Sequence, residues 1–241
     1  MKFKVEIQSF APVWFPQNPT FDNFVWVFNN LARDPLLRSA IVVVTSVGLS
    51  LIFGPLMAYA LSRFRFSKSK DVQFWIITTR MLPAAALIMP YYYMFNRLGL
   101  LNTNLGLILL YTAVNLPLTT WIMLAYFQGM STETEEAALI DGCTRWGAFW
   151  FVALPAVRAG VAAGGLITAI LTWNEFFIAF IVTSSNITFP VQVSSFLATG
   201  MNPEYGNMAA AGLLLSLPPT LLTIIFRRYL ISGLHAFAGG K

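Results

Sequence analysis

The sequence predicts an all-α, polytopic membrane protein with about five transmembrane helices. Hydrophobic residues make up 57% of the 241-residue chain and charged residues only 10%, whereas soluble domains have about 25% charged residues. The apolar residues gather in five segments, and each is close to the roughly 20 residues that a helix needs to cross a bilayer. These segments are residues 39–61, 72–94, 105–127, 161–182 and 208–226.

The composition argues against several other classes of protein. The Lys and Arg residues behind the net charge of +5 are scattered and form no continuous basic face of the kind that binds nucleic acid. The single cysteine, Cys143, excludes an internal disulfide, and the single histidine, His235, leaves no metal cluster. The sequence has no P-loop motif, so any ATP hydrolysis must come from another subunit.

Residues 1–38 are predicted to form an extracytoplasmic lead rather than a signal peptide, because they contain no apolar core of sufficient length. Within this lead, Thr20 can cap a short amphipathic helix. The apolar residues on one face of that helix are Phe21, Phe24, Val25, Phe28 and Leu31. The helix would either lie on a membrane surface or pack against neighbouring protein.

Prolines interrupt the apolar segments, and kinks are expected there because proline removes a helical hydrogen bond. These prolines are Pro55, Pro83, Pro90, Pro117, Pro218 and Pro219.

The basic residues predict the orientation of the chain in the membrane. Lys and Arg cluster in residues 63–70, after the first segment, and follow the last segment in residues 227–241. By the positive-inside rule both flanks are cytoplasmic. Alternation of the spans then places residues 131–155 in the cytoplasm and residues 185–207, which contain no Lys or Arg, outside.

Residues 131–155 are predicted to form a helix, a turn and a second helix. Thr132 and Glu135 fit a capping box at the start of the first helix. Gly142 can adopt the left-handed conformation that closes it. Thr144 can then cap the second helix, which Pro155 ends or kinks.

The same loop carries a longer pattern, E-A-A, three residues, G, nine residues, an aliphatic residue, one residue, L-P. It resembles the cytoplasmic loop signature of bacterial ABC importer permeases, in which the aliphatic residue is often Ile. The matching residues are Glu136, Ala137, Ala138, Gly142, Val152, Leu154 and Pro155. Further stretches resemble the maltose-type, carbohydrate-transporting branch of that family: residues 80–83 (RMLP), 99–103 (GLLNT), 173–180 (WNEFFIAF) and 227–241.

The resemblance implies a permease subunit of an ATP-driven importer in the bacterial cytoplasmic (inner) membrane. Residues 39–232 would form the transmembrane permease domain and residues 233–241 a cytoplasmic tail. The chain itself would hold no cofactor. Its partners would be a dimer of ATPase subunits that binds ATP and Mg²⁺, a second permease subunit, and an extracytoplasmic solute-binding protein that delivers a sugar.

The resemblance also assigns residues that couple the permease to the ATPase: Glu136, Ala137, Ala138, Asp141 and Gly142. Glu136 would pair with a basic group in a groove of the ATPase, the two alanines would permit close approach, and Gly142 would permit the turn.

The family normally has one more helix ahead of a proline-containing external loop, which FAPVWFPQNPTFDNF resembles. The sequence is therefore expected to lack the family's first span, through a truncation, a wrongly placed start codon or natural variation. In the first two cases the native product would be about 30–45 residues longer.

Two charged residues lie inside apolar segments. At 1.5 Å per residue, Arg80 and Glu175 lie about 14 and 21 Å into their segments, where an ionisable group costs about 3 kcal/mol unless it is paired or hydrated. With Asn174 they are candidates for the translocation path. The alternatives are a structural ion pair, snorkelling of Arg80 to an interface, and a hydrogen bond between helices from Asn174.

Small residues repeat at a spacing of four, at Gly160, Gly164 and Thr168 and again at Gly165 and Ala169. Such a face allows helices to approach closely, either within the permease or between it and a partner permease.

Two other functions are considered. An ion-coupled secondary transporter would use Arg80 and Glu175 for coupling and would need no ATPase. An intramembrane enzyme would need a nucleophile or metal set that the sequence does not offer.

Overall fold

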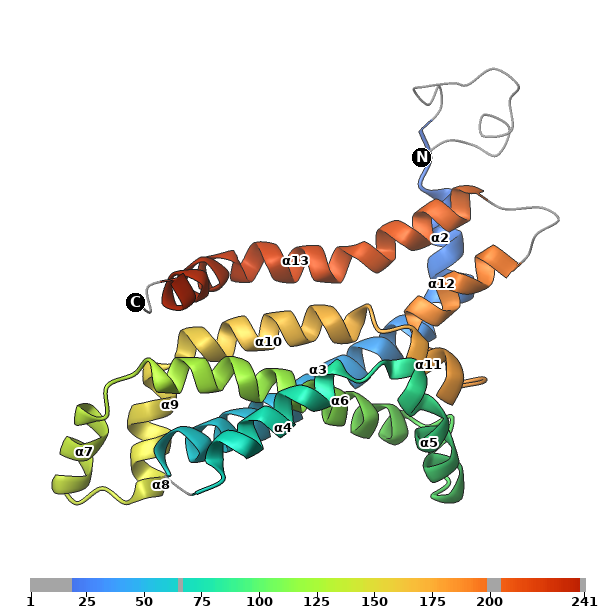
Figure 1. The fold of residues 1–241 in the computed structure, drawn as a ribbon. Helices are drawn as coiled ribbons and strands as arrows, with labels where there is room; N and C mark the ends of the chain where they lie inside the picture. Colours follow the sequence, from blue (N-terminus) through green and yellow to red (C-terminus); the bar gives the residue numbers. More distant parts are fainter. Residues whose placement is uncertain (1–18, 65–66, 199–204, 239–241) are drawn as a thin grey trace.

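The computed structural model describes residues 19–64, 67–198 and 205–238, which are helical with short connections (Figure 1). The all-α prediction is confirmed. The elements are α2 (Asp22–Val27), η1 (Phe28–Ala32), α3 (Arg33–Arg63), α4 (Ser69–Met81), α5 (Ala84–Arg97), α6 (Asn104–Gln128), α7 (Glu133–Ile140), α8 (Arg145–Gly147), η2 (Ala148–Ala153), α9 (Leu154–Ala156), α10 (Arg158–Trp173), α11 (Phe177–Val182), α12 (Phe189–Ala198) and α13 (Tyr205–Ala238), where η marks π-helical turns.

Among the described residues, three helices are long and apolar enough to cross a membrane. They are residues Asp22–Arg63, Asn104–Gln128 and Tyr205–Arg227. Two bent helix pairs raise the number of possible spans to five, since each pair has the length and composition of one span. The bend between α4 and α5 is 94°, and the bend between the helical segment 145–156 and α10 is 73°.

The second predicted span, residues 72–94, is not one continuous helix. Leu82 is extended, with ψ of 129°, and α5 starts only after Pro83. The ring of Pro83 disfavours helical geometry at the residue before it, which explains the break. Pro90 lies in the same predicted span but inside α5, so only one of the two prolines breaks the helix.

The fourth predicted span, residues 161–182, is also interrupted. Helix α10 ends at Trp173 and α11 begins at Phe177. The carboxylate of Glu175 accepts hydrogen bonds from the backbone N–H groups of Ile178 and Ala179, at 2.9 and 3.2 Å. A charged side chain thus satisfies the exposed donors at the start of a new helix.

The helix predicted after Thr20 is not a separate short element. Thr20 does accept a hydrogen bond from the Asp22 N–H, at 3.1 Å, but α2, η1 and α3 run on as one 42-residue helix. Val27 and Ala32 are buried against residues of α12 and α13. The lead therefore packs on protein, although Phe21 on its predicted apolar face is 75% exposed. Residues 1–18, with most of FAPVWFPQNPTFDNF, and 239–241 of the tail lie outside the described residues.

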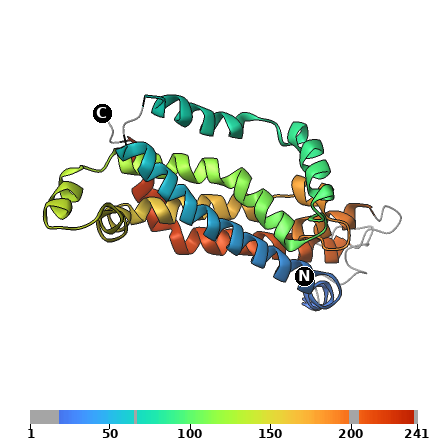
Figure 2. The same ribbon diagram turned by 90° about the horizontal axis from the view of Figure 1, so that it is seen from below.

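Helices α3, α6 and α10 pack side by side in the centre of the molecule, and α13 lies along α10 (Figures 1 and 2). A Cβ on Gly160 would lie 2.5 Å from the Tyr126 ring of α6, so this approach requires glycine. One turn further, a Cβ on Gly164 would lie 3.5 Å from Ile122, and the hydroxyls of Thr168 and Thr119 are 3.2 Å apart. The predicted small-residue face thus forms a contact within this chain.

Candidate functional site

Helix α7 lies at one end of the bundle, beyond the C-terminal ends of α3 and α6 (Figure 1). The capping box predicted at its start is absent. Thr132 has helical backbone angles and makes no side-chain capping bond. Ser131 accepts the Glu133 N–H instead, at 3.2 Å. Glu135 is buried and faces the transmembrane helices rather than the start of its own helix.

The partner of Glu135 is Arg63, the last residue of α3. The Nε and one terminal nitrogen of Arg63 both donate to Glu135 Oε1, at 2.9 and 2.7 Å. The Tyr59 hydroxyl donates to Glu135 Oε2, at 2.9 Å. Such charge-assisted bonds are stronger than the capping bond that they replace.

Arg63 also closes the end of α6. It donates to the carbonyl oxygens of Phe127 and Met130, at 2.9 and 3.3 Å. These carbonyls lie at the helix end, where no intrahelical donors remain. One guanidinium therefore joins α3, α6 and α7. Sequence analysis missed this role; the available signal was an arginine ending the first apolar segment and a second carboxylate beside Glu136.

The C-terminal end of α7 has the structure that the sequence predicts. Gly142 has φ of +89°, and its N–H donates to the Leu139 carbonyl at 3.1 Å, while the Cys143 N–H donates to the Ala138 carbonyl at 2.9 Å. This pair of bonds is a Schellman motif. Thr144 caps the next helix by accepting the Gly147 N–H at 3.1 Å, also as predicted.

The predicted coupling residues lie together on α7 and its terminal turn. Glu136, Ala137, Asp141 and Gly142 are exposed, and Ala138 is half-buried. Ile140, beside them, is 86% exposed. The buried Glu135 holds the helix while its neighbours remain accessible, so α7 can present a rigid surface to another protein.

A second candidate site is a cavity of about 370 Å³ between α4, α5, α6 and α11. Its polar and charged lining residues include Thr79, Arg80, Tyr91 and Glu175. Both helix breaks border it, since Leu82 and Glu175 belong to the interrupted segments. Irregular backbone at membrane depth is tolerated where it lines such a cavity.

Arg80 and Glu175 face the same cavity but do not form an ion pair. Arg80 donates to the Val114 carbonyl at 2.8 Å. Glu175 accepts from the Tyr111 hydroxyl at 2.9 Å as well as from the α11 backbone. Asn174 is not among the cavity residues, because its side chain donates to the Ile170 carbonyl of its own helix, at 2.9 Å.

The GLLNT stretch contains a structural clamp that sequence analysis did not foresee. Asn102 has φ of +58°. Its Oδ1 accepts the N–H groups of Ser184, Ser185 and Asn186, at 3.0, 3.1 and 2.8 Å. The connection between α5 and α6 is thereby fixed to the one between α11 and α12.

Comparison with known protein families assigns the chain. Residues 40–235 match the family described as "Binding-protein-dependent transport system inner membrane component". The chain belongs to this family. It is therefore the permease subunit of an ABC importer, and the ATPase of such importers is a separate subunit. The ion-coupled transporter is not supported.

Individual relatives agree with this assignment. The permease is 30% identical over 239 residues to the sulfoquinovosyl glycerol transport system permease protein SmoH of Agrobacterium fabrum, covering 98% of this chain and 84% of the relative. It is 30% identical over 224 residues to the trehalose/maltose transport system permease protein MalG of Thermococcus litoralis, covering 91% and 81%. A solved bacterial ABC transporter that imports the acidic polysaccharide alginate has the same fold, with TM-score 0.76, 24% identity and coverage of 92% and 84%.

Proposed function

We propose that this permease translocates a sugar, delivered by an extracytoplasmic solute-binding protein, across the cytoplasmic membrane of a bacterium. The names of its relatives support the substrate class, since they refer to sulfoquinovosyl glycerol, trehalose and maltose. The complete transporter contains a second permease subunit and two ATPase subunits, which bind ATP and Mg²⁺. The permease holds no cofactor of its own.

The observation that carries the proposal is the anchored but exposed helix α7. Its exposed face carries Glu136, Ala137 and Asp141, which enter a groove of the ATPase subunit. There Glu136 pairs with a basic group, and the alanine face allows close approach. Gly142 supplies the sharp turn that keeps α7 short and rigid.

When the ATPase dimer closes on ATP, its groove moves α7. The contacts of Glu135 with Arg63 and Tyr59 pass this displacement to α3, and those of Arg63 with the α6 carbonyls pass it to α6. Helix α6 also forms one wall of the cavity, through Ala113, Val114 and Pro117. A displacement of α7 therefore changes the shape of the cavity.

We assign the cavity to the translocation path. It lies between two interrupted helices, an arrangement that transporters use for substrate sites near the bilayer midplane. Arg80 and Glu175 are its charged groups, and they supply hydrogen-bond donors and acceptors to a passing polar solute.

Affinity purification from the native membrane, with identification of every co-purifying subunit, tests the assembly. An ATPase subunit and a second permease are expected. Uptake of labelled sugars by the purified complex in vesicles, with the solute-binding protein added, then tests the substrate class. Uptake driven by an ion gradient without ATP would overturn the proposed mechanism.

A further inference from the structure

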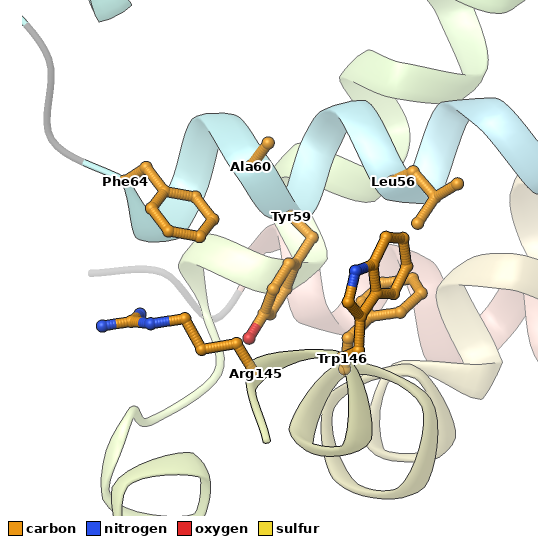
Figure 3. A pocket seen from close by; sticks show the side chains of 7 residues that line it. Leu56, Tyr59, Ala60, Phe64, Arg145 and Trp146 are labelled. Carbon is orange, nitrogen blue, oxygen red and sulfur yellow. The ribbon is translucent and has the colours of Figure 1, made fainter. Parts of the chain in front are cut away.

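A groove of about 280 Å³ lies between the last two turns of α3 and the start of α8. Figure 3 shows Phe64 and Arg145 at one end of it and Leu56 and Trp146 at the other. Tyr59, Ala60 and Phe149 complete the lining. Of these seven described residues only Arg145 is charged, so the groove is apolar with one cation at its edge.

The cation has no acidic partner among the residues that the structure describes. Arg145 makes no ion pair or hydrogen bond with any residue in the described ranges; its guanidinium lies over the Phe64 ring, 5.5 Å from the ring centroid. Arg63, the residue before Phe64, is already paired with Glu135. Within the described part of the chain, the positive charge at the mouth of the groove is therefore not compensated by an acidic side chain.

The orientation of the neighbouring helices places the groove relative to the membrane. If α10 crosses the bilayer, the helical segment 145–156, bent by 73° from it, runs close to parallel with the membrane plane. Three aromatic side chains on this segment are exposed, Trp146 at 64%, Trp150 at 47% and Phe151 at 81%. Tryptophan concentrates where hydrocarbon meets headgroups.

The geometry points to a binding site for one anionic phospholipid. The phosphate binds the Arg145 guanidinium, which suits phosphate through paired N–H donors. An acyl chain lies in the groove against Leu56, Ala60 and Trp146. Basic pockets between helices on the cytoplasmic side recognise lipid headgroups in this way. The site touches both α3 and the segment that follows α7, so a bound lipid would brace the connection to the coupling helix.

Native mass spectrometry of the assembled transporter tests the site, because it resolves single bound lipids. Phosphatidylglycerol and phosphatidylcholine with the same acyl chains are titrated separately. The wild-type complex should bind phosphatidylglycerol about fivefold more tightly than phosphatidylcholine, the effect of one basic residue near an anionic lipid. Arg145→Gln should abolish that preference. Arg158→Gln removes an exposed charge outside the groove and should keep it.

A second pair of variants tests the apolar part. Ala60→Phe fills the groove and should weaken binding of both lipids, whereas Val44→Phe, at a position 72% exposed on the same helix, should not. Unchanged phosphatidylglycerol preference in Arg145→Gln would overturn the proposal. Equal competition by glycerol 3-phosphate, which has no acyl chain, would also overturn it. Lipid binding that occurs only after the ATPase subunits are removed would overturn it as well, because the groove would then belong to the ATPase interface. These readouts do not depend on sugar transport.

Discussion

Arg63 and Glu135 form a buried ion pair across 72 positions of the sequence, with nitrogen–oxygen distances of 2.9 and 2.7 Å. The pair links α7 to the transmembrane bundle through one carboxylate. Its neighbour Glu136 points to solvent. Glu135 is thus buried and Glu136 exposed. We therefore expect substitutions of these two adjacent residues to have different consequences.

Glu135→Ala should destabilise the permease strongly. Removing one partner of a buried ion pair costs about 3–5 kcal/mol, because the other charge remains buried. The double variant Glu135→Leu with Arg63→Met should cost less than Glu135→Ala alone. Thermal unfolding of the purified complex measures both. Equal stability of Glu135→Ala and wild type would show that the pair is not structurally important.

Glu136→Ala should leave the permease folded in the membrane but weaken ATPase binding and abolish uptake, because the side chain is exposed and assigned to the interface. Subunit retention during purification and vesicle uptake measure the two effects. If ATPase binding and uptake were both normal, α7 would not be the coupling element.

Gly142→Pro should also abolish uptake, because proline fixes φ near −65° and the native φ is +89°. The matched control is Gly142→Asn, since asparagine adopts left-handed conformations more readily than other residues. It should retain most of the activity. Loss of uptake in both variants to the same degree would point to a requirement other than backbone conformation.

Gly160→Ala should lower the yield of folded permease. The added Cβ would lie 2.5 Å from the Tyr126 ring, and overpacking of this kind costs about 1–3 kcal/mol. Gly48→Ala is the control, because nothing lies within 4 Å of a Cβ there, and alanine favours the helix. Thermal stability should fall only for the first variant; a similar fall for both would argue against the close contact.

Arg80→Gln and Glu175→Gln should have additive effects on uptake. The two residues have separate hydrogen-bond partners, Val114 for Arg80 and Tyr111 with the α11 backbone for Glu175. Independent sites add within about 0.5 kcal/mol. Uptake rates of both single variants and the double variant give the coupling energy. Recovery of activity in the double variant would instead indicate an ion pair in some transport state.

The sequence predicted local features better than distant contacts. Gly142 and Thr144 were identified because their roles depend on residues within a few positions, and the structure confirms both. Glu135 was misassigned because its position fits a local capping box, while the competing partner lies 72 residues away. A local pattern such as the capping box does not show which of two possible partners of Glu135 lies closer in the folded protein.

The apolar segments in the sequence indicated how many spans are possible, but they did not show which spans are continuous helices. Pro83 breaks its span and Pro90 does not, although both occur in one apolar stretch. Glu175 accepts backbone hydrogen bonds at the start of α11. The segment around it is hydrophobic on average, so its hydropathy does not reveal the break. Both interruptions border the cavity that α4, α5, α6 and α11 form together.

The Asn102 clamp limits how the end of the permease that is predicted to lie outside can move. Three backbone N–H groups of residues 184–186 converge on one amide oxygen, and the Asn186 side chain returns a bond to the Asn102 carbonyl at 2.8 Å. Separating the two loops would break all of these bonds at once. We therefore expect the two loops to move as a single unit during transport, with any hinges at the helix breaks after Met81 and Trp173.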